Sequence, residues 1–209
     1  NLGVCSDFYV RSSLLEEIYK TSYSLDVFGE VQIPNLKQRF KHNALQLRST
    51  ISQNAFSILK TSKISYWANT SNLPPNPWDF SKDFTRKVKS PLYGQVMLEK
   101  MGSYNVALNY HNKHTGDYAC NMRLFEATGL GCTLVTDNKS DIADYFEKDK
   151  EILVFSSVKE AVDKISYLVN NPSKAEEIGR AGQTRCLKDH NSEIRNQRLL
   201  ELINIILKK

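Results

Sequence analysis

The first part of the chain combines two kinds of hydrophobic pattern. Residues 2–5 form a short apolar run, and Val10, Leu14 and Ile18 then recur at helical spacing. Residues 25–28 alternate between apolar and polar positions as in a strand, and the pattern stops at Gly29. A strand, a helix and a second strand within this length predict a βαβ unit.

The alternation of helices and strands resumes after Pro91, a residue type well suited to open a helix. The patterns predict a helix over 93–101, a strand over 104–110, a helix over 121–128, a strand over 132–136, a short helix over 141–146 and a strand over 152–155. Gly129 and Gly131 are expected to end the second of these helices. The fully apolar composition of 132–136 is typical of a strand buried on both faces.

The last third of the chain is predicted to be helical. Two capping boxes, Ser157 with Glu160 and Ser173 with Glu176, each predict a helix start. Pro172 separates these two helices, and Asn191 or Ser192 is expected to cap a last helix over 191–207. Strands that alternate with helices predict an α/β fold with a doubly wound, Rossmann-like parallel sheet.

Residues 31–90 interrupt this alternation. Apolar residues at helical spacing between positions 47 and 59 predict one amphipathic helix. The proline-rich stretch 73–78 excludes a regular helix or a central strand. We therefore interpret 31–90 as a helical and loop insertion within a single domain that covers residues 1–209.

The composition is that of an ordinary globular domain. The 209 residues are 41% hydrophobic and 24% charged, and no apolar run approaches the roughly 20 residues that span a bilayer. The four cysteines form no CxxC pair, which predicts reduced core residues in a cytoplasmic protein. Because the chain starts without Met or a signal-peptide pattern, we expect it to be part of a longer protein.

The net charge of +5 is unevenly distributed. No carboxylate lies between Glu30 and Asp79, and the basic residues in this stretch are Lys37, Arg39, Lys41, Arg48, Lys60 and Lys63. This basic segment, 31–78, is a candidate surface for an anionic partner, for example a membrane to which the protein is peripheral, and the alternative is a solvated helix face. Aromatic and basic residues do not interleave there as in nucleic-acid motifs, so we expect no nucleic-acid partner.

Candidate chemistry is concentrated in the loop over 111–123. Ligands of a doubly wound sheet bind at the carboxyl ends of the strands, and this loop follows one of them. It leads into a predicted helix start, where backbone N–H groups favour a phosphate. Glu126, inside that helix, is placed to accept hydrogen bonds from ribose hydroxyls, as carboxylates do in dinucleotide-binding folds.

The segment Arg-Leu-Phe-Glu-Ala-Thr-Gly-Leu-Gly-Cys-Thr-Leu-Val-Thr-Asp over 123–137 resembles group-1 glycosyltransferases of the GT-B fold. Within these enzymes the chain is most similar to the branch named after the spore-maturation protein CgeB. The stretches 91–94, 109–111, 151–155, 165–168 and 181–183 continue the resemblance, as does His190. The similarity covers 91–207 well and 1–29 loosely.

The resemblance implies the C-terminal half of a GT-B enzyme, which binds a nucleoside-diphosphate sugar without a metal or another cofactor. Glu126 would then hold the ribose, and the backbone of Asn121 and Met122 would meet the diphosphate. Arg123 and Arg11 are candidate positive charges for the leaving diphosphate. Two further donor-site candidates are Tyr93 and Asn109. The acceptor, a glycan, a lipid or a protein, would be bound by a missing N-terminal domain.

The chain departs from the pattern of many retaining members of the family. They carry a second Glu eight positions before the ribose-binding one, where this chain has Tyr118. Asp117 beside it and His111 are the candidate catalytic residues. The alternative is a non-catalytic nucleotide-sugar-binding or docking module. A dehydrogenase is disfavoured because the loop after the first strand, 6–9, lacks the glycines of a dinucleotide fingerprint.

Overall fold

The computed structural model describes residues 8–21, 23, 25–28, 82–111, 116–119 and 121–208. The chain divides into two compact units, one of residues 1–30 and 87–209 and one of residues 31–86. In the second unit the described part is confined to α4, Lys82–Lys87, which extends one residue into the first unit. The predicted amphipathic helix and the basic segment 31–78 therefore lie outside the described residues, as does the predicted strand over 2–5.

The first unit is built on a parallel sheet, as predicted. Within the described residues the sheet has three strands in the order β1-β2-β3. They are β1 (Val106–Asn109), β2 (Thr133–Asp137) and β3 (Leu153–Phe155). The register pairs Asn109 with Thr136 and Asp137 with Phe155, so the three carboxyl ends meet at one edge.

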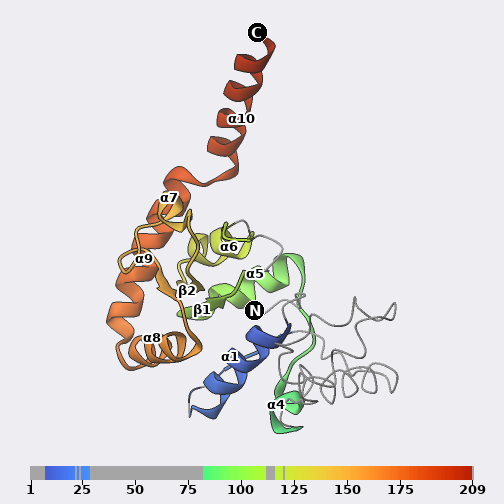
Figure 1. The fold of residues 1–209 in the computed structure, drawn as a ribbon, viewed down its shortest axis with the longest axis vertical. Helices are drawn as coiled ribbons and strands as arrows, with labels where there is room; N and C mark the ends of the chain where they lie inside the picture. Colours follow the sequence, from blue (N-terminus) through green and yellow to red (C-terminus); the bar gives the residue numbers. More distant parts are fainter. Residues whose placement is uncertain are drawn as a thin grey trace, which may run out of the picture. The chain divides into compact units, whose positions relative to one another are not determined.

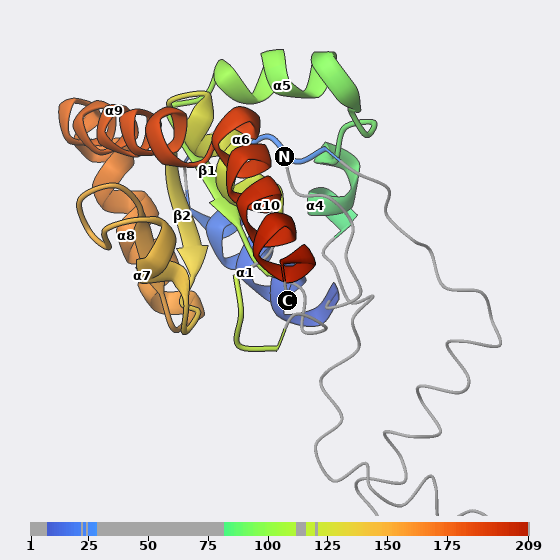
Figure 2. The same ribbon diagram turned by 90° about the horizontal axis from the view of Figure 1, so that it is seen from above.

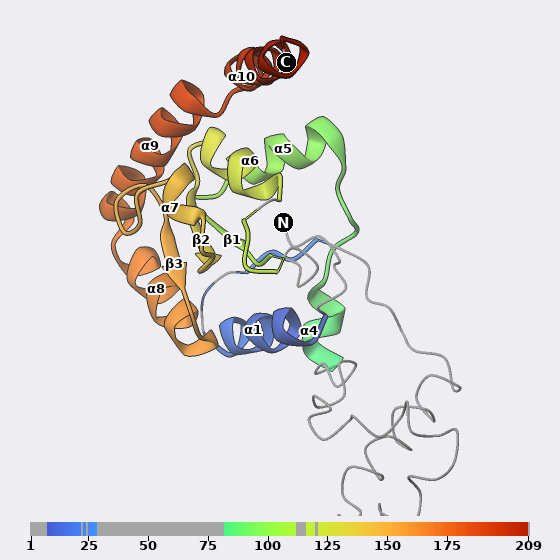
Figure 3. The same cartoon turned by 45° about the horizontal axis from the view of Figure 1, so that its top comes forward.

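Helices cover both faces of this sheet, which confirms the doubly wound prediction (Figure 3). In chain order the helices of the first unit are α1 (Phe8–Lys20), α5 (Gly94–Gly102), α6 (Arg123–Gly129), α7 (Ile142–Tyr145), α8 (Val158–Asn170), α9 (Pro172–Asp189) and α10 (Ser192–Leu207). Both α8 and α9 contact β2 (Figure 2). All five residues of β2 are buried, as the apolar run predicted.

Two hydrophobic clusters fill the space between the sheet and these helices. Successive residues of β2 belong to different clusters, Leu134 to one and Val135 to the other. The Leu134 cluster includes Met97 and Met101 of α5, Leu124 of α6 and Phe146 after α7, and the Val135 cluster includes Leu14 and Ile18 of α1 with Ile165 and Leu168 of α8. This alternation is the two-residue period of a strand buried on both sides.

Helix α9 packs on the sheet through glycines. A Cβ added to Gly179 would lie 2.4 Å from the carbonyl oxygen of Gly131, and one added to Gly182 would lie 2.4 Å from that of Glu151. Real Cβ atoms do not approach a backbone oxygen so closely, so glycine is required at both positions. Gly131 itself has φ 82°, a left-handed conformation that glycine adopts without strain.

The helix starts predicted in the last third of the chain agree with the structure in two of three cases. Ser157 accepts a hydrogen bond from the Glu160 amide at 3.2 Å, and Asn191 accepts one from the Ile194 amide at 2.9 Å. The capping box predicted at Ser173 is wrong, because α9 already begins at Pro172. Proline at the first helical position needs no partner for an amide hydrogen, which makes the earlier start favourable.

Two further predictions differ from the structure, one for residues 25–28 and one for Pro91. Residues 25–28 form no ladder but a single parallel bridge between Phe28 and Lys89. The neighbouring segment runs into Pro91, which has no amide hydrogen for a longer ladder. Pro91 also does not open the next helix, since α5 begins at Gly94 after an extended Tyr93.

The last helix, α10, extends beyond α9 (Figure 1). None of its residues is buried, and its exposed large apolar side chains are Leu199, Leu200, Leu202, Ile203, Ile205, Ile206 and Leu207. Among the described residues, no helix has the length and apolar character needed to cross a membrane. Cys132 and Cys186 are buried free thiols, as predicted, whereas Cys5 and Cys120 lie outside the described residues.

Candidate functional site

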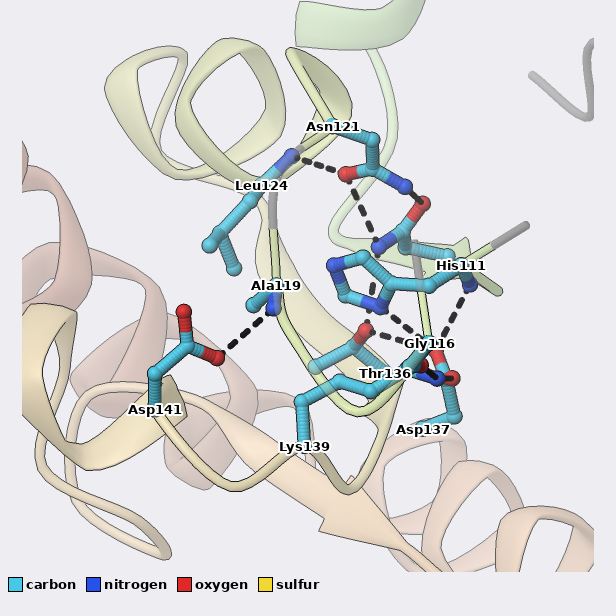
Figure 4. A network of polar contacts seen from close by, with 10 residues as sticks. His111, Gly116, Ala119, Asn121, Leu124, Thr136, Asp137, Lys139 and Asp141 are labelled. Atoms are coloured by element: carbon cyan, nitrogen blue, oxygen red, sulfur yellow. Dashed lines mark hydrogen bonds and ion pairs between the residues drawn. The ribbon is translucent and has the colours of Figure 1, made fainter. Parts of the chain in front are cut away.

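A polar network occupies the carboxyl ends of β1 and β2 (Figure 4). Asn109, the last residue of β1, is 4% exposed and donates from Nδ2 to the Thr136 hydroxyl at 3.0 Å. Thr136 and Asp137 end β2 and are also buried. Polar side chains are rarely placed in so dry a position unless each has partners, which the network supplies.

The same network fixes the beginning of α6. Asn121 donates from Nδ2 to Oδ1 of Asn109 at 2.8 Å, and Asn109 donates back to Oδ1 of Asn121 at 3.2 Å. Oδ1 of Asn121 also accepts from the Leu124 amide at 3.2 Å. The sequence singled out Asn121 for its backbone, whereas in the structure its side chain joins the first turn of α6 to the end of β1.

His111 and Asp137 form a buried pair at this edge (Figure 4). Oδ1 of Asp137 accepts from the His111 backbone N–H at 2.8 Å and lies 2.7 Å from ring Nδ1. Burial by itself raises the pKa of the Asp137 carboxyl, but the hydrogen bonds from His111 and the nearby charge of Lys139 outweigh it. The pKa of Asp137 therefore lies below its ordinary value, and the carboxylate is ionised at neutral pH.

The other ring nitrogen of His111 stands apart from this network. The residue is 1% exposed, and among the described residues Nε2 has no hydrogen-bond partner. An unsatisfied buried polar atom is unusual in a protein and calls for a functional or structural explanation.

The loop segment 116–119 is tied to the residues that follow β2. Lys139 donates from Nζ to the Gly116 carbonyl at 2.8 Å and lies 3.5 Å from Oδ2 of Asp137. The Asp117 carbonyl accepts from the Ser140 amide at 2.9 Å and from its hydroxyl at 2.8 Å. Asp117 is thus anchored through its backbone and is exposed, as is Tyr118 beside it.

Arg123 and Glu126 form an ion pair with each other on α6. Their side chains are 31% and 20% exposed, so both are within reach of solvent and of a ligand. This is the local pairing expected of opposite charges three residues apart on a helix. The ribose and phosphate contacts predicted for these side chains stay predictions, and each requires its side chain to exchange this partner for a ligand.

The other candidates are distributed more widely. Met122 is 74% exposed just before α6. Tyr93 is also 74% exposed, and it precedes α5 without capping that helix through its side chain. Arg11 belongs to α1, and its side chain lies outside the described part of the structure. The structure brings Asn109, His111 and Asn121 together and leaves Tyr93 and Met122 outside the network.

Three members of the network, Thr136, Asp137 and Lys139, were not among the predicted site residues. A signal for Asp137 was available, because an ionisable residue directly after four apolar or hydroxyl residues of a buried strand marks the carboxyl edge of the sheet. No comparable signal existed for Lys139, whose contacts depend on how two loops meet.

Within the described residues no group of three or more His, Cys, Asp or Glu side chains is arranged to hold a metal ion. Independence from metals stays a prediction, because the loop over 112–115 and residue 120 fall outside those residues.

Comparison with known proteins gives one family. A family described as glycosyl transferase-like matches residues 11–201. A search of curated proteins found no match.

Several solved structures share the fold. HepE from Anabaena, in a complex with UDP, superposes with a TM-score of 0.59 at 11% identity, over 97% of this chain and 48% of that one. Sucrose-phosphate synthase from Thermosynechococcus elongatus gives 0.58 at 11% identity, over 96% and 42%. TarM gives 0.56 at 15% identity, over 97% and 34%. The chain thus spans between about a third and a half of these proteins, and at such low identity the likeness shows the fold alone.

Proposed function

The chain belongs to the glycosyl transferase-like family, and we propose that it is the domain of a glycosyltransferase that binds a nucleoside-diphosphate sugar. The enzyme would transfer this sugar to an acceptor without a metal ion. The GT-B fold supports the proposal, because one GT-B half supplies the donor site in the family that the sequence resembles. We place the chain in the branch similar to CgeB on the residues of 123–137.

One observation carries the proposal: the buried polar network at the carboxyl ends of β1 and β2. In open parallel sheets this edge is where ligands bind. Asn109, Asn121 and His111 lie there together, and Glu126 is one helical turn further along α6. The UDP and UDP-glucose complexes of HepE, which has the same fold, support a nucleotide sugar as the ligand class.

We place the donor along α6. Glu126 would accept from the ribose hydroxyls, and the diphosphate would lie near the backbone of Asn121 and Met122. Arg123 would then leave Glu126 for a phosphate oxygen. A bidentate arginine contact of this kind gains charge-assisted hydrogen bonds as negative charge develops on the leaving group.

A thermal-shift screen tests donor binding. The 209-residue chain is heated with a panel of nucleoside diphosphates and their sugar derivatives, and Glu126→Ala is measured beside it. A ligand at a hundredfold excess over its Kd stabilises a protein by roughly 2.7 kcal/mol. We expect one diphosphate to raise the melting temperature of the wild type and to have much less effect on Glu126→Ala. If the folded protein is stabilised by none of them, the proposal is wrong.

We further propose that transfer requires an additional acceptor-binding domain. The chain covers between 34% and 54% of the structures named above, and GT-B enzymes work in the cleft between two domains. The chain is therefore expected to bind donor and to transfer no sugar by itself. Sugar transfer by residues 1–209 to any glycan, lipid or protein acceptor would refute this part of the proposal.

A second candidate function is a nucleotide-sugar-binding module without catalysis. Tyr118 stands where many retaining relatives have a catalytic-site Glu, and its side chain is 64% exposed. Asp117 beside it is a candidate substitute for that Glu. Donor binding by the complete protein with neither transfer nor hydrolysis would favour this second function, whereas loss of turnover in Asp117→Asn would favour the enzyme.

A further inference from the structure

We propose that His111 binds the diphosphate of the donor through Nε2, and that Asp137 is the positioning residue that holds its ring for this contact. The inference rests on the proposed function and goes beyond it, because it couples donor binding to the uptake of a proton. It starts from the enclosed Nε2 of His111, which has no partner among the described residues.

The contacts of His111 determine what Nε2 offers to a ligand. Oδ1 of Asp137 is an acceptor, so the ring nitrogen Nδ1 at 2.7 Å is the donor and carries a hydrogen. The backbone N–H of His111 donates to the same oxygen at 2.8 Å, so two hydrogen bonds hold the Asp137 carboxylate against His111. Nε2 then carries a hydrogen only when the ring is the imidazolium cation, and a phosphate oxygen needs that hydrogen as its donor.

The charges around His111 favour an anion as the ligand of the protonated ring. Asp137 stabilises the positive charge of an imidazolium from one side. Among the described residues, the other charged groups on the segments around His111 are Lys139 and Asp141 after β2, Asp117 in the loop before α6, and Arg123 with Glu126 on α6. Both cations of this set already contact a carboxylate, Lys139 that of Asp137 and Arg123 that of Glu126. The imidazolium therefore adds a positive charge for the phosphate beside that of Arg123, which leaves Glu126 in the proposed donor placement, and it does not remove the contact between Lys139 and Asp137.

The position of the ring fits the proposed donor placement. Hydrogen bonds connect Asp137 through Thr136 and Asn109 to Asn121, whose backbone is expected to lie near the diphosphate. Figure 4 shows this chain of contacts running from the His111 ring to the first turn of α6. Because Nε2 is enclosed, a phosphate reaches it only if neighbouring atoms shift when the donor binds.

Proton uptake is the direct measurement. The 209-residue chain is titrated by calorimetry with the nucleoside diphosphate that stabilises it most, and with inorganic pyrophosphate as a probe without a base. Each titration is repeated in two buffers with different heats of ionisation, at several values between about pH 5 and 8, where imidazoles change charge. We expect the protein to take up a proton when the nucleotide binds, in addition to any proton that the nucleotide itself exchanges. We also expect the affinity to fall as the pH rises.

Three variants assign the proton. His111→Gln is expected to bind at least about tenfold more weakly at the acidic end of the range and to lose the additional uptake, since it cannot form the charge-assisted hydrogen bond. Asp137→Asn keeps an acceptor oxygen but removes the charge, so the pH dependence of binding should differ from that of the wild type. His190→Gln is the matched control, because His190 is also buried but its Nε2 lies 2.8 Å from the Tyr145 carbonyl, away from the network.

The outcomes separate this inference from the proposed function. If no diphosphate binds, the proposed function itself fails. If a diphosphate binds wild type and His111→Gln with the same proton uptake, the function stands and the role of His111 is wrong. Binding of the sugar derivative alone, without additional uptake, would assign Nε2 to a sugar hydroxyl and would also overturn the inference. Unchanged pH profiles in a folded Asp137→Asn would reduce Asp137 to a structural role.

Discussion

The packing of α9 on the sheet makes a sharp prediction for Gly179→Ala. The added Cβ would lie 2.4 Å from the carbonyl oxygen of Gly131 and 3.2 Å from both the amide and the hydroxyl of Thr133. The nearest atom belongs to the backbone and cannot rotate away, so α9 must move from β2 by several tenths of an ångström or more. That movement disturbs the hydrogen bond from the Thr133 hydroxyl to the Ala175 carbonyl.

Two opposing effects determine the magnitude. Overpacking of a core costs about 1–3 kcal/mol, and a clash with backbone falls at the upper end of this range. Alanine in place of glycine inside a helix returns about 1 kcal/mol through its higher helix propensity. We therefore expect a net loss of about 2 kcal/mol, which lowers the melting temperature of a domain of this size by about 4–8 °C.

The assay is thermal unfolding followed by circular dichroism, with Gly129→Ala as the matched control. A Cβ at Gly129 would meet only the Cys186 sulfur, at an ordinary 3.5 Å. This control should melt at the wild-type temperature or a few degrees higher, because alanine restricts the unfolded chain. If Gly179→Ala melted at or above the temperature of Gly129→Ala, the close approach of α9 to β2 would be refuted.

Three further predictions follow from single contacts. Asn191→Ala removes the cap on α10 and should destabilise the first turn by about 1 kcal/mol, seen as several-fold faster amide exchange at Ile194; unchanged exchange would contradict the cap. Burial raises the pKa of the Cys132 thiol to about 11, so at pH 8 a thiol reagent should modify it only as fast as the protein opens, and immediate modification would contradict its burial. Burial lowers the pKa of His190 although the hydrogen bond to the Tyr145 carbonyl opposes the shift. The stabilising contribution of the neutral ring is therefore present above about pH 6.5 and is lost as the pH falls through the lower pKa of the folded protein. The loss of stability in acid, measured by urea unfolding, should be smaller in His190→Gln, and an equal pH dependence of stability in both proteins would refute the assignment.

The order of elements could be predicted because each depends on local pattern. The apolar run before Asp137 has one stable environment, a strand covered on both faces, and the structure places all of β2 there. The helix start at Ser157 follows from the hydrogen bond that its own side chain accepts from the Glu160 amide. The error at Ser173 has the same local origin, since Pro172 offered a competing start that the capping pattern alone did not weigh.

The site could be predicted only in part, because its contacts connect distant residues. His111 and Asp137 are 26 residues apart, and their pairing depends on the register of β1 against β2. A sequence pattern identifies a polar loop after a strand but does not specify which ring nitrogen finds a partner. The Arg123–Glu126 pair, by contrast, can be predicted from sequence alone, since its residues are three positions apart on one helix.

The proposed donor site depends most on the contact between Glu126 and the ribose. Calorimetry with the nucleoside diphosphate that binds best, and with its 2′,3′-dideoxy counterpart, measures how much affinity the ribose hydroxyls contribute, in the wild type and in Glu126→Ala. We expect the wild type to prefer the ribose form by about tenfold or more, the effect of hydrogen bonds to a charged group, and Glu126→Ala to lose most of this preference. An undiminished preference in Glu126→Ala, or no binding of either nucleotide to the folded wild type, would contradict the assignment of this chain as a nucleotide-sugar-binding domain with Glu126 at its ribose.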